Sequence, residues 1–259
     1  MPLGDSAWLE VHVDGDGVRG APPIVLLHGA GGTGALFAPL CARLAPHRTL
    51  AVSFPGRAGS TGPALEHVEA LADVVTRAQA ALGLGPCVLC GHSMGGAVAL
   101  ALALRAPAHV AGLVLVSTGA RLRVAPPILD LWQQAAACGE GQSVSAAAFG
   151  ADADPAEVAR VASLERAIDP RTVLADWHAT NGFDRLGALA AVTQPALVLC
   201  GDADVLTPPK YSEYLAAHLP RARVRLFAGA GHMLVFEQAN LVADEVRAFV
   251  RELTNEAAG

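Results

Sequence analysis

The chain has 259 residues, of which 53% are hydrophobic and 16% charged, and it contains 27 glycines and 17 prolines. This composition excludes a disordered, collagen-like or coiled-coil protein and predicts one well-cored domain that carries at most an insertion. The net charge of −6, without a run of Lys or Arg, offers no footprint for nucleic acid, and no apolar run is long enough to cross a bilayer.

The first half of the chain alternates between apolar runs and helical periodicity. An alternating segment at 8–14 predicts an edge strand in a hairpin that turns at 14–17. Helical spacing follows at 66–82, and a helix of small residues is expected at 97–105. Wholly apolar runs, typical of buried parallel strands, lie at 24–27, 48–54, 87–90 and 110–116. This alternation predicts an α/β protein with a mostly parallel central sheet flanked by helices.

The strand pattern stops between about 119 and 189, where the sequence becomes helical. Prolines suited to the first position of a helix stand at 126, 155 and 170. We interpret 119–189 as a helical cap inserted into a core formed by 1–118 and 190–259. Beyond the cap, strands are expected at 196–200 and 223–227, helices at 208–219 and 241–253, and a frayed end at 255–259.

A G-x-S-x-G pentapeptide, 91–95, lies between a predicted strand and the helix of small residues. Its glycines are expected because side chains at those positions would collide with the neighbouring strand and helix. Ser93 would then project its Oγ as a nucleophile, and the Met94 N–H at the start of the helix would stabilise an oxyanion. The alternative is a glycine-rich turn with an incidental serine.

An acid and a base follow this serine in the order that nucleophilic catalysis uses on an α/β sheet. Asp202 and Asp204 come after the strand at 196–200, at the carboxyl end where open α/β sheets place their sites. Either carboxylate would orient the base. His232 follows the strand at 223–227 in a loop of small residues, and neutral imidazole accepts a serine proton at pH 7.

Two further motifs are weaker. The G-x-G-x-x-G pattern at 29–34 resembles a dinucleotide fingerprint, but it lacks the acidic residue expected about 20 residues later. Those glycines are better explained as room for a substrate carbonyl to approach backbone N–H groups. Cys87 and Cys90 form a C-x-x-C, yet on a strand positions i and i+3 point to opposite faces. No cofactor and no metal are therefore expected, and five scattered cysteines favour a reducing, cytoplasmic location.

Four residues are assigned to a substrate pocket. His28, at the end of the strand 24–27, is expected to be a buried histidine that bonds the backbone beside the oxyanion site. Trp132, Phe149 and Trp177 of the cap would supply an apolar wall above the nucleophile. These aromatics are equally explained by packing of the cap onto the sheet. His92 is expected to point away from the nucleophile, towards the core or the site wall.

With these residues in view, the sequence resembles the α/β-hydrolase fold superfamily over nearly its whole length, in the serine-nucleophile, esterase-like branch with a helical cap. The family's acid is the fourth residue of a Gly-x-x-Asp loop that runs on to Thr-Pro, which implies Asp204, with Asp202 as the runner-up. The family's His-Gly pattern implies Ala30 as the second oxyanion donor. Ser53 replaces the first Asp of the family's Asp-x-Pro-Gly-x-Gly-x-Ser turn, a departure in a structural turn only.

Ser93, His232 and Asp204 are thus predicted to hydrolyse a carboxylic ester of a small or medium apolar acid through an acyl-enzyme. By the resemblance, serine at the nucleophile position disfavours the alkyl-enzyme chemistry of dehalogenases and epoxide hydrolases. Lactone, thioester or carbon–carbon bond hydrolysis on the same triad, and a non-catalytic ligand-binding relative, stay open. The expected partner is a small-molecule ester or acyl substrate, not nucleic acid or membrane, and the oligomeric state is undetermined.

Overall fold

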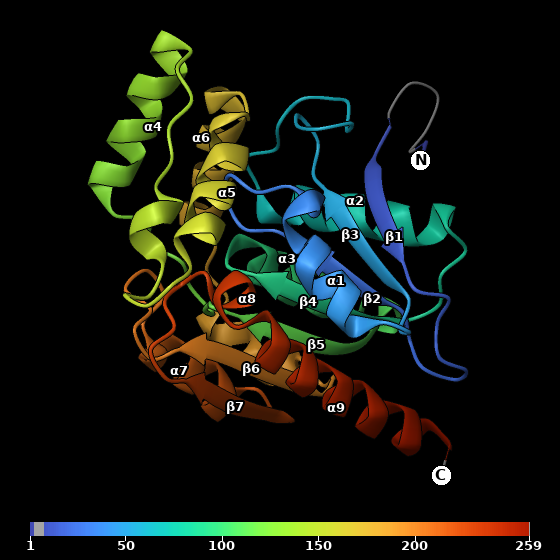
Figure 1. Cartoon of the computed structure of the whole chain (residues 1–259). Helices are drawn as coiled ribbons and strands as arrows, with labels where there is room; N and C mark the ends of the chain where they lie inside the picture. Colours follow the sequence, from blue (N-terminus) through green and yellow to red (C-terminus); the bar gives the residue numbers. More distant parts are fainter. Residues whose placement is uncertain (3–7, 259) are drawn as a thin grey trace.

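The central feature of the computed structural model, which describes residues 1–2 and 8–258, is a seven-stranded sheet (Figure 1). The strands are β1 (Glu10–Asp14), β2 (Ile24–Leu27), β3 (Thr49–Ser53), β4 (Cys87–His92), β5 (Val110–Val116), β6 (Ala196–Gly201) and β7 (Ala222–Phe227). Their order across the sheet is β1-β3-β2-β4-β5-β6-β7. Only β1 is antiparallel to its neighbour, and the other pairs are parallel, as the apolar runs predict.

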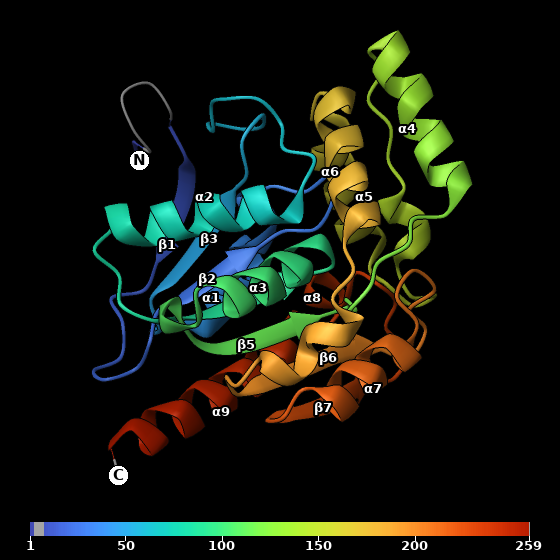
Figure 2. The same cartoon turned by 180° about the vertical axis from the view of Figure 1, so that it is seen from behind.

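Helices cover both faces of the sheet (Figures 1 and 2). One face packs against α1 (Ala38–Leu44), α8 (Leu234–Glu237) and α9 (Ala239–Ala258), and the other against α2 (Val68–Ala81), α3 (Met94–Arg105) and α7 (Pro209–His218). Short 3-10 helices are η1 (Gly34–Phe37), η2 (Pro107–His109), η3 (Ser145–Ala148) and η4 (Leu186–Ala191). None of the helices in the described part of the chain is long and apolar enough to cross a membrane.

The two cysteines of the C-x-x-C pattern lie on opposite faces of β4, as their spacing predicts. Cys87 is buried in the core between the sheet and α2 and α3, whereas Cys90 is buried in the core on the side of α1 and α9. Burial raises the pKa of the Cys90 thiol to about 12. Thiolate is the form that binds metals and attacks disulfides, so the position of Cys90 disfavours both kinds of chemistry.

The predicted hairpin at the start of the chain is wrong in its partner. β1 is an edge strand, but it pairs with β3 and not with β2, with Glu10 opposite Ser53 and Asp14 opposite Thr49. The turn after β1 packs closely against the segment before β3. A Cβ on Gly15 would lie only 2.2 Å from the carbonyl oxygen of His47, so no side chain fits there. The chain therefore passes over β3 before it enters the centre of the sheet.

A helical region is inserted between β5 and β6 and lies beyond the carboxyl ends of the strands (Figure 1). Its helices α4 (Pro126–Cys138), α5 (Pro155–Arg166) and α6 (Pro170–Gly182) each begin at the proline that predicted them. Asp154 and Asp169 cap α5 and α6 by accepting backbone N–H bonds of 2.9 and 2.8 Å. The limits of the cap at 119 and 189 stay a prediction.

Two helix ends differ from the prediction. Helix α3 begins at Met94, directly after Ser93, because glycines at 95 and 96 are accepted in a first turn that packs closely on the sheet. Helix α9 continues to Ala258, so the expected fraying from 255 onwards is wrong for the described residues. An ion pair of 2.7 Å between Arg221 and Glu256 attaches the last turns of α9 to the segment that enters β7.

Candidate active site

Ser93 occupies a strained turn between β4 and α3. Its backbone has φ 53° and ψ −117°, a combination that side chains rarely adopt. The flanking glycines permit the turn, since a Cβ on Gly91 would lie 2.2 Å from the Gly95 oxygen and a Cβ on Gly95 would lie 2.0 Å from the Leu27 oxygen. The predicted reason for glycine at both positions is therefore met by the geometry.

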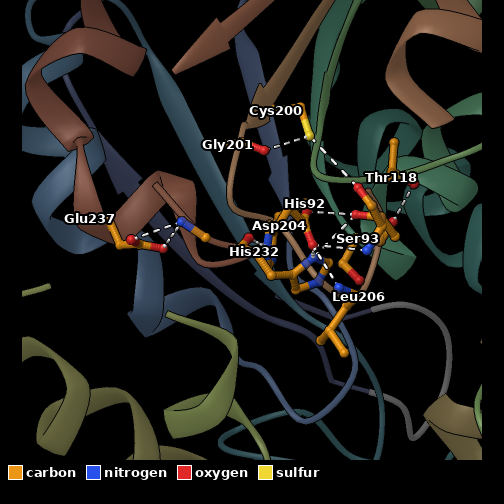
Figure 3. A network of polar contacts seen from close by, with 11 residues as sticks. His92, Ser93, Thr118, Cys200, Gly201, Asp204, Leu206, His232 and Glu237 are labelled. Carbon is orange, nitrogen blue, oxygen red and sulfur yellow. Dashed lines mark hydrogen bonds and ion pairs between the residues drawn. The ribbon is translucent and has the colours of Figure 1, made fainter. Parts of the chain in front are cut away.

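Hydrogen bonds with Val116, the last residue of β5, and with Thr118 just after it fix the position of Ser93. Its N–H donates a 2.9 Å bond to the oxygen of Val116, and the hydroxyl of Thr118 donates a 2.8 Å bond to the Ser93 oxygen (Figure 3). The residue is 9% exposed and lines two adjoining pockets, both of which also include His232. The serine and the histidine thus meet at one solvent-accessible groove, although they are far apart in the sequence.

His232 is hydrogen-bonded to Asp204. Its Nδ1 lies 2.9 Å from Oδ2 and 3.1 Å from Oδ1 of the carboxylate (Figure 3). A carboxylate accepts hydrogen bonds, so Nδ1 carries the proton and Nε2 is left as the basic nitrogen. The Thr207 hydroxyl donates a 2.8 Å bond to Asp204 Oδ2 and lies 3.2 Å from His232 Nδ1, so it bridges the two side chains.

Hydrogen bonds keep Asp204 ionised despite its burial. Burial by itself raises the pKa of this carboxyl, which is 3% exposed, but the bonds from His232 and Thr207 outweigh burial and hold the pKa below its ordinary value. The backbone N–H groups of Leu206 and Thr207 add bonds of 2.9 and 2.8 Å. Asp202, in contrast, is exposed and accepts a 2.8 Å bond from Gly229 N, so the structure pairs Asp204 with the histidine.

The loop that carries His232 is held from three sides. His232 N donates a 2.7 Å bond to Ala148 O of the inserted region, and His92 Nε2 donates a 2.9 Å bond to His232 O. The carboxylate of Glu237 accepts bonds of 3.0 and 3.1 Å from Gly231 N. A Cβ on Gly231 would lie 2.5 Å from Ala148 O, so the small residues of this loop allow it to pack closely, as predicted.

Two buried histidines beside the site are held neutral. Burial, with a smaller contribution from His232, lowers the pKa of His92 to about 3. Burial and the nearby Arg57 guanidinium lower the pKa of His28 well below its usual range. His28 donates a 2.8 Å bond from Nδ1 to Gly29 O and accepts a 3.2 Å bond from Phe54 N, the backbone bonding expected of it. Both histidines line the groove without the carboxylate partner that His232 has.

The predicted oxyanion donors flank the serine. A Cβ on Gly29 would lie 3.1 Å from the Cβ of Ser93, so the loop that carries Ala30 passes directly beside the nucleophile. Met94 is the first residue of α3, and its N–H consequently has no partner within the helix. Ala30 also lines the groove. Both residues therefore lie beside Ser93, and their role as oxyanion donors stays a prediction.

A buried ion pair fixes the loop that carries Ala30. Asp176 of α6 accepts bonds of 2.5 and 2.6 Å from the two Nη atoms of Arg57, and neither side chain is exposed. The same carboxylate accepts a 3.0 Å bond from Gly31 N, while Arg57 donates a 3.3 Å bond to Gly32 O. Two charged side chains from distant segments thus hold the backbone next to Ala30.

The inserted region provides only part of the predicted aromatic wall. Trp177 lines both pockets at Ser93. Trp132 is fully buried inside the inserted region, where it packs with Ala135, Ile168, Val173 and Trp177. Phe149 packs against the core on the α9 side of the sheet. The structure therefore brings His28 and Trp177 to the pocket walls, but neither Trp132 nor Phe149.

Sequence reasoning missed Thr207, which bonds Asp204, Asp176, which bonds the loop after Ala30, and Glu165, which lines the pocket at Ser93. Thr207 had a signal, because it belongs to the Thr-Pro pair that follows the acid in the family's loop. Asp176 and Glu165 had none, since an acidic residue in a helical segment usually faces solvent. Among the described residues, no group of three or more His, Cys, Asp or Glu side chains is arranged to hold a metal ion.

Comparisons with known proteins give one consistent fold. Residues 22–239 match the model of the alpha/beta hydrolase fold family. The pimeloyl-[acyl-carrier protein] methyl ester esterase of Nitrosomonas europaea is 31% identical over 241 residues, which cover 86% of this chain and 92% of that protein. The crystal structure of the enol-lactonase from Burkholderia xenovorans LB400 superposes with a TM-score of 0.86 at 26% identity, covering 95% of this chain and 98% of that one.

A third relative is much longer than this chain. The polyketide synthase ThaQ of Burkholderia thailandensis is 33% identical over 252 residues, which are 91% of this chain. The chain spans only 12% of the length of that protein. The similarity therefore concerns one part of the synthase.

Proposed function

The chain belongs to the alpha/beta hydrolase family, and we propose that it is a serine esterase that cleaves a carboxylic ester of a small or medium, largely apolar acid. The observation that carries this proposal is the bond between His232 Nδ1 and Asp204, in a groove that the histidine shares with Ser93. In this proposal Ser93 supplies the weakly acidic hydroxyl, His232 is the base that activates it, and Asp204 is the carboxylate that orients the base.

In the proposed reaction, Ser93 Oγ attacks the ester carbonyl carbon while Nε2 of His232 accepts the hydroxyl proton. The N–H groups of Ala30 and Met94 stabilise the oxyanion that develops on the carbonyl oxygen. Collapse of this intermediate breaks the bond to the alcohol, which leaves with the proton from His232. Water then attacks the acyl-enzyme by the same steps and releases the acid. Asp204 stays ionised throughout and stabilises the imidazolium.

The walls of the groove support an apolar substrate. On one side of Ser93 the lining includes Leu36, Val161 and Phe236, and on the other side Leu122 and Ile128. Apolar walls with a few polar groups are typical of small-molecule sites. The relative from Nitrosomonas europaea, which is named as a methyl ester esterase, supports the same class of bond.

Hydrolysis of p-nitrophenyl esters from acetate to decanoate tests the proposal, with wild type and Ser93→Ala measured side by side as kcat/KM. We expect wild-type turnover, a loss of at least about 10⁴-fold in the variant, and an optimum chain length that reports the size of the acyl pocket. Labelling of Ser93 by a fluorophosphonate is a second readout. Labelling without turnover of any ester would favour a ligand-binding protein.

A second candidate is a lactonase. The similarity to the enol-lactonase over 95% of this chain favours it, and a lactone is an internal ester that the same groups can open. The ester series distinguishes the two when it is extended with lactones of matched carbon number. A kcat/KM at least tenfold higher for the lactones would replace the open-chain ester as the proposed substrate.

A further inference from the structure

Glu165 is a buried carboxyl in the wall of the groove. It lies on α5 of the inserted region, is 2% exposed, and lines the same pocket as Ser93. Its neighbours in that wall include the apolar side chains of Val144, Ala148 and Val161. A carboxyl in such surroundings is costly unless its oxygens are hydrogen-bonded.

The two oxygens of Glu165 differ sharply in their partners. Oε2 accepts three bonds: 2.6 Å from the Ser143 hydroxyl, 2.7 Å from the Ser145 hydroxyl and 3.2 Å from Ser145 N. Oε1 is buried and has no hydrogen-bond partner among the described residues. A buried polar atom without a partner costs about 1–3 kcal/mol, so a bound ligand that hydrogen-bonds Oε1 would remove an unfavourable contribution.

The unpartnered oxygen lies against the loop that carries Ala30 and Gly31. A Cβ on Gly31 would lie 2.9 Å from Glu165 Oε1, and Gly31 has a φ of +69°. Gly31 directly follows Ala30, one of the two proposed oxyanion donors. Glu165 itself lines the pocket at Ser93, so its unpartnered oxygen is at the boundary between the Gly31 loop and that pocket. A polar group of a substrate in that pocket can supply the missing partner, since Ser93 lines the same pocket.

The chemistry of that partner follows from the state of the carboxyl. Burial raises the pKa of Glu165, and the bonds from Ser143 and Ser145 offset part of that rise. An ammonium group would need the ionised form, and a second carboxylate would be repelled by it. A hydroxyl both donates and accepts, so it satisfies the ionised and the neutral form alike.

We propose that Glu165 is a specificity-determining residue that hydrogen-bonds, through Oε1, a hydroxyl group on the otherwise apolar part of the substrate that occupies this pocket. The inference rests on the proposed esterase function and refines its substrate class to hydroxylated esters. The bonds from Ser143 and Ser145 hold the carboxyl in place, and Oε1 accepts or donates the hydrogen bond to the substrate hydroxyl.

Matched pairs of esters with and without one hydroxyl test this role. One series carries the hydroxyl on the acyl chain, with p-nitrophenyl hexanoate and its 3-hydroxy and 6-hydroxy derivatives. The other carries it on the alcohol, with butyl and 4-hydroxybutyl butyrate. The proteins are wild type, Glu165→Gln, Glu165→Met and, as a control on the same helix, Glu157→Gln, whose residue pairs with Arg160 outside the pocket.

In at least one series we expect wild type and Glu157→Gln to prefer the hydroxylated ester at least tenfold in kcat/KM. Glu165→Met should bring that ratio to about one, because an apolar side chain of similar length offers no hydrogen bond. Glu165→Gln should keep most of the preference. An equal loss for all esters in Glu165→Met, or a ratio that no variant changes, would overturn the proposal.

A binding measurement that needs no turnover tests the role of Glu165 separately from the esterase function. Calorimetry with Ser93→Ala compares 6-hydroxyhexanamide with hexanamide, and repeats the pair on Ser93→Ala carrying Glu165→Met. At least tenfold tighter binding of the hydroxyl compound, lost in the double variant, supports the role of Glu165 even if no ester is turned over. Fluorophosphonate labelling of Ser93 without any hydroxyl preference in binding or turnover leaves the nucleophile intact and refutes Glu165 alone.

Discussion

The two sides of the proposed catalytic groove hold their side chains by different means. On the nucleophile side, Ser93 is held by the close approach of Gly91 and Gly95 to backbone oxygens and by backbone hydrogen bonds. On the acid–base side, Asp204 and His232 are held by side-chain hydrogen bonds in a loop region. Steric contacts respond to added volume, whereas polar contacts respond to the loss of one atom and to pH.

One bond joins the two sides. His92 precedes the nucleophile on β4, and its Nε2 donates to the backbone oxygen of His232. Substitutions on the acid–base side should therefore reduce turnover while the fold remains, and those on the nucleophile side should reduce stability as well.

Asp204→Asn should have the largest effect. The amide cannot hold Nδ1–H of His232 as a carboxylate does, so kcat should fall about 10⁴-fold, or about 5.5 kcal/mol, with the protein still folded. Asp202→Asn is the matched control, because among the described residues its side chain hydrogen-bonds Gly229 N alone, and its kcat should stay within about threefold of wild type. The reverse order of the two effects would make Asp202 the acid.

Gly95→Ala should act on stability. Its Cβ would lie 2.0 Å from the Leu27 oxygen, so β2 or α3 must shift, and the free energy of unfolding should fall by about 3 kcal/mol. Gly187→Ala adds the same methyl where no atom lies within 4 Å and should change stability by less than about 0.5 kcal/mol. Urea unfolding of both variants checks the contrast. Equal stabilities would show that the turn adapts without strain.

The buried His92 should make stability depend on pH. Its pKa is about 3 in the folded protein, whereas an unfolded histidine has a pKa of about 6.5. Between these values the unfolded chain binds more protons, so the stability present above pH 6.5 is lost as the pH falls. From pH 7 to pH 5 the loss should be about 2 kcal/mol from this residue. Urea unfolding at both pH values should show a smaller difference in His92→Asn, and an unchanged difference would contradict the assignment.

Thr207→Val should have the smallest effect. It removes the hydroxyl between Asp204 and His232, so kcat should fall about tenfold, equivalent to about 1.4 kcal/mol. The lost bond favoured the carboxylate, so the pKa of Asp204 should rise, which an NMR titration of that carboxyl measures. Thr207→Ser restores a hydroxyl and should restore both. A rate equal to wild type in the Val variant would show that backbone N–H groups alone position the acid.

The parallel strands and the order Ser93, Asp204, His232 were accessible from the sequence because their signals are local. A wholly apolar run marks a strand buried on both faces, and a proline after an aspartate marks a helix start. The choice between Asp202 and Asp204 was different. The residues alone left it open, and it depended on the family's loop pattern, because two positions in one loop differ only in where the backbone turns.

Features that depend on distant contacts could not be predicted. The pairing of β1 with β3 joins residues about 40 positions apart, and close packing of Gly15 beside His47 accompanies it. Trp132 and Trp177 look alike in the sequence, yet Trp132 fills the interior of the inserted region whereas Trp177 reaches the groove. The burial and hydrogen bonding of Glu165 depend on Ser143, Ser145 and the loop at Gly31, none of which adjoins it in the sequence.

The buried Arg57–Asp176 pair limits how the inserted region can be exchanged. Asp176 lies in the inserted region, whereas Arg57 and the loop it supports belong to the core. A chimera that takes its inserted region from a relative without a carboxylate at this position would leave the Arg57 charge buried and unpaired, at a cost of about 3–5 kcal/mol. In this scaffold, exchange of the inserted region would therefore also disturb the core loop that carries the proposed oxyanion donor Ala30.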